Sequence, residues 1–149
     1  MRVLFLEFDG VLHPASAAYR FAPGNSLRQS VLALWLFRWA WILDELLLPH
    51  PDIRIVTHSN WRLLASDEEL KGVLGPLARR FVGTTPHGTK WSSILAIAQL
   101  NELHDYRILD AWPEVFPPDI PELIVCDTEA GLQDLRVQSQ LASWLKCVV

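Results

Sequence analysis

Five short apolar runs alternate with helix-like segments along the chain, and this alternation restricts the possible folds strongly. The runs cover residues 3–8, 53–57, 81–83, 107–109 and 123–126. Strands that alternate with helices pair in parallel, and the helices then cover both faces of the sheet. The pattern predicts an α/β fold, a Rossmann-like three-layer sandwich with a mostly parallel central sheet of about five strands.

The segments between these runs predict the helices. Residues 30–48 are apolar nearly all round, which is typical of a buried helix. Residues 63–80 predict a helix with a break at Gly75 and Pro76, and Thr89 is a suitable N-cap for a helix that continues to residue 103. The other expected segments are a closing helix over residues 132–146 and a polar excursion over residues 15–29 that contains Pro23, Gly24 and Asn25.

The composition indicates one globular domain that covers residues 1–149. Half of the residues are hydrophobic and the net charge is −4, so disorder and a global attraction to nucleic acid are both disfavoured. The two cysteines cannot form a disulfide framework, and no signal-peptide pattern opens the chain, so we expect a cytoplasmic protein. Residues 31–43 are too few to span a membrane, and their three tryptophans make this segment a candidate homo-oligomer interface.

The first apolar run ends in two acids two residues apart, and a glycine follows at once. Successive side chains of a strand point to opposite faces, so Glu7 and Asp9 are expected to share one face, and Gly10 allows a sharp turn after them. Two neighbouring carboxylates are costly unless a cation or a proton compensates them. Ligands of parallel sheets bind beyond the carboxyl ends of the strands. We therefore expect a functional site here.

Several segments resemble the motifs of haloacid-dehalogenase-like (HAD) phosphotransferases, in particular the small, nearly capless HAD domains associated with RNA-repair proteins. The resemblance covers nearly the whole chain. One departure is that Glu7 stands where the family has a nucleophilic Asp, and another is that Ala111 stands where a second Asp is frequent. The matching segments are FLEFDGVLHP at residues 5–14, IVTHSNWR at 55–62, VGTTPHGTKW at 82–91, YRILDAW at 106–112 and LIVCDTEAGL at 123–132.

The resemblance implies a set of catalytic roles. Glu7 takes the place of the nucleophile, and Asp9 that of the general acid and base. Ser59 is expected to bind the phosphate through its hydroxyl group, with Thr57 as the alternative, and Lys90 is the expected phosphate cation. Lys90 has independent support, because a cation in the first turn of a helix opposes the helix dipole and indicates a nearby anion.

The resemblance also implies a Mg²⁺ site and a phosphorylated substrate. The expected metal ligands are Glu7, Asp9 and Asp110, since Mg²⁺ prefers oxygen ligands. Gly10 and Arg62 join Thr57 as expected substrate-binding residues. A nucleic-acid end is one expected substrate, and this expectation comes from the resemblance alone.

Glu7 leaves three hypotheses open. Glutamate is longer than aspartate by about 1 Å, and a displacement of that size can cost about 100-fold in rate. The chain is then a Mg²⁺-dependent phosphatase, a catalytically degenerate domain that binds phosphate, nucleotide or a protein, or a hydrolase that activates water. For His13 and His58 we expect structural or solvated roles, because neither has a recognisable partner in the sequence.

Overall fold

The five expected strands form one sheet. The computed structural model describes residues 1–18 and 26–147, and in these residues the strands are all parallel, in the order β3-β2-β1-β4-β5. The predicted α/β class and parallel sheet are therefore confirmed. The strands are β1 (Arg2–Leu6), β2 (Ile53–Thr57), β3 (Phe81–Thr84), β4 (Tyr106–Asp110) and β5 (Leu123–Val125).

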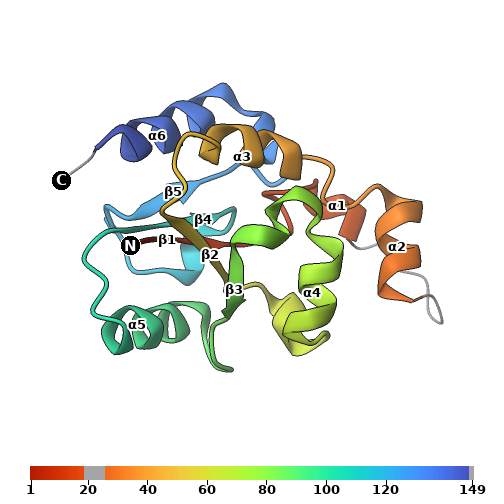
Figure 1. Cartoon of the computed structure of the whole chain (residues 1–149), viewed down its shortest axis with the longest axis horizontal. Coiled ribbons are helices and arrows are strands. Elements are labelled where there is room, and N and C mark those ends of the chain that lie inside the picture. The colour runs from red at the N-terminus through yellow and green to blue at the C-terminus, as the bar shows by residue number, and fades with distance from the viewer. Residues whose placement is uncertain (19–25, 148–149) are drawn as a thin grey trace.

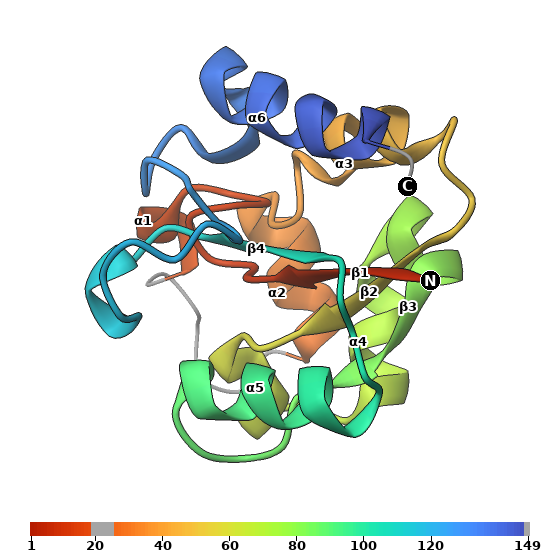
Figure 2. The ribbon, with the colours of Figure 1, turned by 90° about the vertical axis from the view of Figure 1, so that its left-hand side faces the viewer.

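Helices cover both faces of this sheet, as Figures 1 and 2 show. Helices α3 (Ala40–Leu47) and α6 (Leu135–Lys146) lie on one face, and α5 (Lys90–Leu100) lies on the other. Strand β1 alternates between the two layers: Leu4 and Leu6 belong to the core cluster that includes α3 and α6, whereas Val3 and Phe5 pack in a second cluster with α5. The remaining helices are α1 (Ala15–Ala18), α2 (Leu27–Leu34) and α4 (Asp67–Val73), with 3₁₀ turns at Asn60–Leu63, Gly75–Arg80, Pro113–Val115 and Gly131–Gln133.

The prediction of one continuous helix over residues 30–48 is wrong. The chain forms α2 and α3 instead, because Trp35 and Phe37 take left-handed backbone conformations with φ of 53° and 60° and end the helical hydrogen bonding. Trp39 is buried, whereas Trp35 is 67 % and Trp41 55 % exposed. The exposed rings belong to two separate short segments, and oligomerisation through this region stays a prediction.

The other helices differ from prediction mainly at their ends. The expected break at Gly75 is confirmed by its φ of 58°. Thr89 caps α5 as predicted, but the helix stops at Leu100, and α6 begins after its N-cap Asp134. Pro23, Gly24 and Asn25 of the expected polar excursion lie outside the described residues. Among the helices that the structure describes, none is both long and apolar enough to cross a membrane.

Candidate active site

The expected site residues gather at the carboxyl edge of the three central strands. Glu7 directly follows β1, and its backbone N–H still donates to Leu109 of β4 at 3.0 Å. Asp110 is the last residue of β4, and His58 follows β2. Lys90 is the first residue of α5, which packs on the sheet face toward which Val3 and Phe5 point. Neighbouring parallel strands therefore bring Glu7, His58 and Asp110 to one place, and α5 adds Lys90 from the sheet face.

Lys90 lies between the two carboxylates of this group. Its Nζ is 2.5 Å from Glu7 Oε2 and 3.5 Å from Asp110 Oδ2. Burial lowers the pKa of Lys90, but the negative charges of Glu7 and Asp110 outweigh this effect and raise it above the usual value. Lys90 is therefore a stable cation. Its position in the first turn of a helix predicted a nearby anion, and Glu7 and Asp110 are such anions.

The other Glu7 oxygen contacts the backbone. Phe8 N–H donates to Glu7 Oε1 at 2.9 Å, so the long side chain folds back toward its own strand end. The Glu7 side chain is buried. The carboxylate is thus held at both oxygens, by an amide and by an ammonium group.

Asp110 is ionised although it is fully buried. Burial raises the pKa of Asp110, but a 2.8 Å hydrogen bond with His58 Nε2, the charge of Lys90 and the Trp112 N–H donating at 2.9 Å hold it below the usual value. His58 was expected to be structural or solvated. It is buried, and it contacts an acid of the site.

Asp9 belongs to a separate hydrogen-bond network. Its Oδ1 lies 2.7 Å from His13 Nε2 and accepts the Trp61 Nε1–H at 2.9 Å. Regular strand structure ends at Leu6, so the alternation that would place Asp9 beside Glu7 on one strand face does not extend to it. His13 is fully buried and contacts the site, which the sequence reasoning did not assign.

Gly10 allows the loop after β1 to pass close to β4. Its φ is 76°, and a Cβ atom built on it would lie 2.8 Å from the Ala111 Cβ. A side chain at residue 10 would therefore displace the start of the loop or the end of β4. The substrate contact expected of Gly10 stays a prediction.

The two candidate phosphate hydroxyls differ in their hydrogen bonds. Thr57 Oγ1 donates to Leu6 O at 2.6 Å and accepts Ser59 N–H at 3.1 Å, so its only proton is already used. Ser59 Oγ accepts the Trp61 N–H at 3.3 Å, which leaves the Ser59 hydroxyl proton for another acceptor. Thr57 therefore joins β2 to β1, and phosphate binding by the Ser59 hydroxyl stays a prediction.

Arg62 connects two loops through backbone carbonyl groups. Its guanidinium donates to His58 O at 2.6 Å and Ser59 O at 3.1 Å in one loop, and to Gly88 O at 2.9 Å in the loop before α5. The side chain is buried. These bonds support a positioning role for Arg62, and a direct phosphate contact stays a prediction.

The Arg62→Lys variant is expected to lower the free energy of unfolding by about 2 kcal/mol, because one ammonium group cannot satisfy carbonyls of both loops. Urea unfolding followed by tryptophan fluorescence measures the change. Arg79→Lys is the matched control, since the Arg79 side chain is 54 % exposed in an ion pair with Asp44 and should change stability by less than about 0.5 kcal/mol. Equal effects of the two variants would contradict the connecting role of Arg62.

Three residues of this site could hold a divalent cation. Ligand atoms of Glu7, His58 and Asp110 all lie within 4.8 Å of one another, and all three residues are buried. His58 Nδ1 is buried and makes no hydrogen bond in the described part of the chain. If His58 Nε2 bound a metal, the imidazole proton would be on Nδ1. Metal-bound histidines normally donate this second N–H to a hydrogen-bond acceptor, and His58 Nδ1 has none among the described residues. The chemistry of the set therefore favours carboxylate ligands from Glu7 and Asp110, with His58 as a donor to Asp110.

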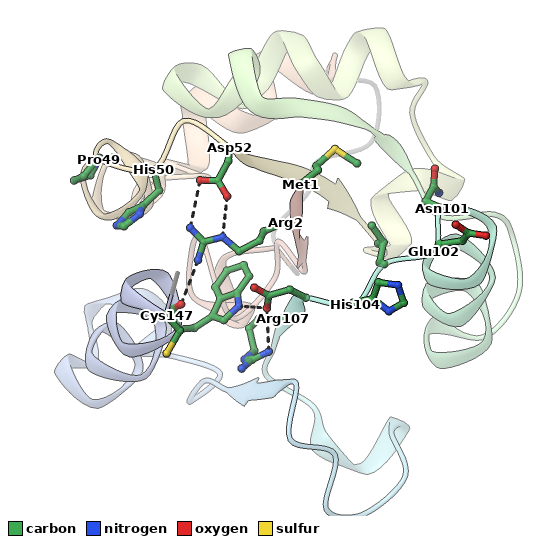
Figure 3. A pocket seen from close by; sticks show the side chains of 13 residues that line it. Met1, Arg2, Pro49, His50, Asp52, Asn101, Glu102, His104, Arg107 and Cys147 are labelled. Carbon is green, nitrogen blue, oxygen red and sulfur yellow. Dashed lines mark hydrogen bonds and ion pairs between the residues drawn. The ribbon is translucent and has the colours of Figure 1, made fainter. Parts of the chain in front are cut away.

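A large hollow lies at the opposite, amino edge of the sheet and contains none of the expected site residues. Its volume is about 930 Å³. Arg2 crosses it, pairing with Asp52 at 2.8 Å and donating to the carbonyls of Trp144 and Leu145 near the end of α6, as Figure 3 shows in part. Arg2 pairs with Asp52 and Arg107 with Asp105, and the hollow lies away from the expected site residues, so we assign it no role in the chemistry.

The comparisons with known proteins identify one family. The model of the HAD domain in Swiss Army Knife RNA repair proteins matches residues 3–137. No curated protein and no solved structure matches the chain. The matched range covers most of the chain, so the predicted resemblance to this family is confirmed, and the roles of the single site residues stay predictions. The chain belongs to the family of HAD domains found in Swiss Army Knife RNA repair proteins.

Proposed function

We propose that this HAD domain hydrolyses a phosphomonoester with the help of a divalent cation, Mg²⁺ being the expected one. The observation that supports this most directly is the buried group of Glu7, Lys90 and Asp110 at the sheet edge. It combines an anionic nucleophile, a fixed cation for phosphate oxygens and an acid for a metal. Phosphoryl transfer depends mainly on such positioning and charge compensation.

In the proposed reaction, a Glu7 oxygen attacks phosphorus while the bond to the leaving oxygen breaks. Asp9 gives its proton to that leaving oxygen. Water then attacks the glutamyl phosphate, Asp9 takes the water proton, and inorganic phosphate and free Glu7 result. Lys90 and the Ser59 hydroxyl bind the phosphate oxygens in both steps. Glu7 and Asp110 would hold the cation. When bound, the cation compensates negative charge on the phosphate oxygens, which eases attack by the anionic nucleophile.

These groups support a phosphomonoester as the substrate, but they do not specify what the phosphate is attached to. A nucleic-acid end stays a prediction, and the buried arginines Arg62 and Arg80 do not support it because their guanidinium groups make structural bonds. Arg62 connects two loops, and Arg80 donates to the carbonyls of Leu47, His50 and Ile53. A generic aryl phosphate is therefore the appropriate first probe.

The Asp9→Asn variant is expected to lower phosphate release from an aryl phosphate by about 10²- to 10⁴-fold, because Asn can accept hydrogen bonds at the same place but cannot transfer a proton. Release should also require added Mg²⁺ and stop with a chelator. The matched control is Asp127→Asn, an exposed acid that also follows a strand and accepts the N–H groups of Glu129 and Ala130. Equal rates of the two variants would contradict the role of Asp9.

A non-catalytic binding domain is the second candidate function, and two departures favour it. Glu7 replaces the expected aspartate, and Ala111, buried against Gly10, supplies no second acid. Such a domain would still be stabilised by phosphate mimics but would release no phosphate. Thermal shifts with vanadate or beryllofluoride, measured beside turnover, distinguish the two functions.

A further inference from the structure

The Asp9 carboxylate is held by two buried aromatic donors. Its Oδ1 receives the Trp61 Nε1–H at 2.9 Å and lies 2.7 Å from His13 Nε2, so both contacts fall on the same oxygen. The His13 ring is fully buried, and Trp61 is nearly so. The Asp9 side chain itself is 29 % exposed.

The backbone of Phe37 determines the tautomer of His13. Phe37 N–H donates to His13 Nδ1 at 3.1 Å. Because a backbone N–H can only donate, Nδ1 must present its lone pair, and the proton of the neutral ring is on Nε2. His13 therefore donates to Asp9 as a neutral imidazole.

Packing also fixes the orientation of the His13 ring. Its centroid is 5.3 Å from that of Phe37 in an edge-to-face contact and 6.0 Å from that of Trp61. Phe37 in turn contacts Phe8 at 5.1 Å, so the cluster connects the strand end that precedes Asp9 with the α2–α3 junction. The left-handed backbone conformation of Phe37 therefore helps to orient the His13 imidazole.

We propose that His13 is the positioning residue for Asp9: by holding Oδ1 together with Trp61, it leaves Asp9 Oδ2 as the oxygen that transfers the proton. The inference rests on the proposed phosphohydrolase function for its kinetic meaning. His13 contacts neither Glu7 nor Lys90 through any bond that the structure describes, so it should affect proton transfer and not phosphate binding.

Two substitutions separate this role from a structural one. In His13→Asn, the amide oxygen can accept the Phe37 N–H but the side chain does not reach Asp9. In His13→Gln, one side chain can accept from Phe37 and donate to Asp9. We expect kcat to fall about 10- to 100-fold in His13→Asn, the effect of one hydrogen bond to a charged group, with KM nearly unchanged and most of kcat restored in His13→Gln.

Leu141→Ala in α6 is the stability control, since Leu141 is buried in the core and belongs to none of the site networks. A purely structural role of His13 predicts that kcat follows stability in all three variants, and this result would overturn the proposal. An unchanged kcat in His13→Asn would overturn it as well.

Nitrogen NMR of the imidazole tests the arrangement without turnover. We expect a proton on Nε2 of His13, whose resonance shifts in Asp9→Ala while a signal of unprotonated Nδ1 persists. A proton on Nδ1, or no response to Asp9→Ala, would overturn the proposal. If the parent protein releases no phosphate, the proposed function fails, and the NMR result alone decides whether His13 positions Asp9.

Discussion

The Lys90→Met variant is expected to release no measurable phosphate and to lose about 3 kcal/mol of unfolding free energy. Lys90 Nζ lies 2.5 Å from Glu7 and 3.5 Å from Asp110, and its removal leaves two buried carboxylates without their cation. Methionine keeps most of the volume and apolar length of lysine, so the decrease in stability and activity is caused by the lost charge and not by lost packing. Urea unfolding and phosphate release measure the two effects.

The double variant Lys90→Met/Glu7→Gln tests the electrostatic cause. Neutralising Glu7 removes one of the two unpaired carboxylates, so stability should recover substantially while activity stays absent. Lys71→Met, at an exposed lysine in the last turn of α4, is the control for loss of a positive charge. If the double variant is as unstable as Lys90→Met, the destabilisation has a cause other than the buried charges.

The Glu7→Gln variant is expected to lower phosphate release by at least about 10³-fold while the protein stays folded. Glutamine can still accept the Phe8 N–H through its amide oxygen, but it cannot attack phosphorus or balance Lys90. Beryllofluoride with Mg²⁺ should raise the melting temperature of the parent protein and not that of the variant. Residual activity close to that of the parent would contradict Glu7 as the nucleophile and favour activation of water.

The Glu7→Asp variant tests whether the site is adapted to glutamate. Because the parent carboxylate is already 2.5 Å from Lys90 and 2.9 Å from the Phe8 amide, shortening it by about 1 Å should weaken both contacts and lower kcat by about 100-fold. A higher rate in Glu7→Asp would instead show a site whose other parts suit aspartate, disabled at one position.

The sheet was predictable because each strand is a local apolar run with polar residues at its end. All five runs form strands, and parallel pairing follows from their alternation with helices. The gathering of Glu7 and Asp110 was predictable for the same reason, since carboxyl ends of neighbouring parallel strands lie at one edge, whereas Lys90 was expected from the resemblance and from its place in the first turn of a helix.

The helix boundaries in residues 30–48 were not predictable from hydrophobicity. A continuous apolar stretch favours one helix, but the chain turns at Trp35 and Phe37, two residue types that seldom adopt positive φ. The neighbours of Phe37 in space are far away in sequence: Phe37 packs on Phe8 and Trp61 and donates to His13. Tertiary contacts outweigh the local preference here.

The roles of the two site histidines were missed for a related reason. His13 and His58 each lie next to a recognised motif residue, which is the only signal in the sequence, but their partners depend on the path of the loops. His58 after β2 reaches Asp110 of β4 across the one strand between them, β1, and His13 reaches Asp9 because the turn at Gly10 brings it back.

The amino-acid sequence by itself determined the α/β class, the strand positions and the identity of the charged groups at the sheet edge, because these depend on local pattern and strand direction. Only the tertiary structure decided which groups pair. It placed Lys90 between Glu7 and Asp110, gave Asp9 a separate network with His13 and Trp61, and used Arg62 to connect two loops. The physical reason is that buried polar groups must find partners, and the nearest partners in space are set by packing.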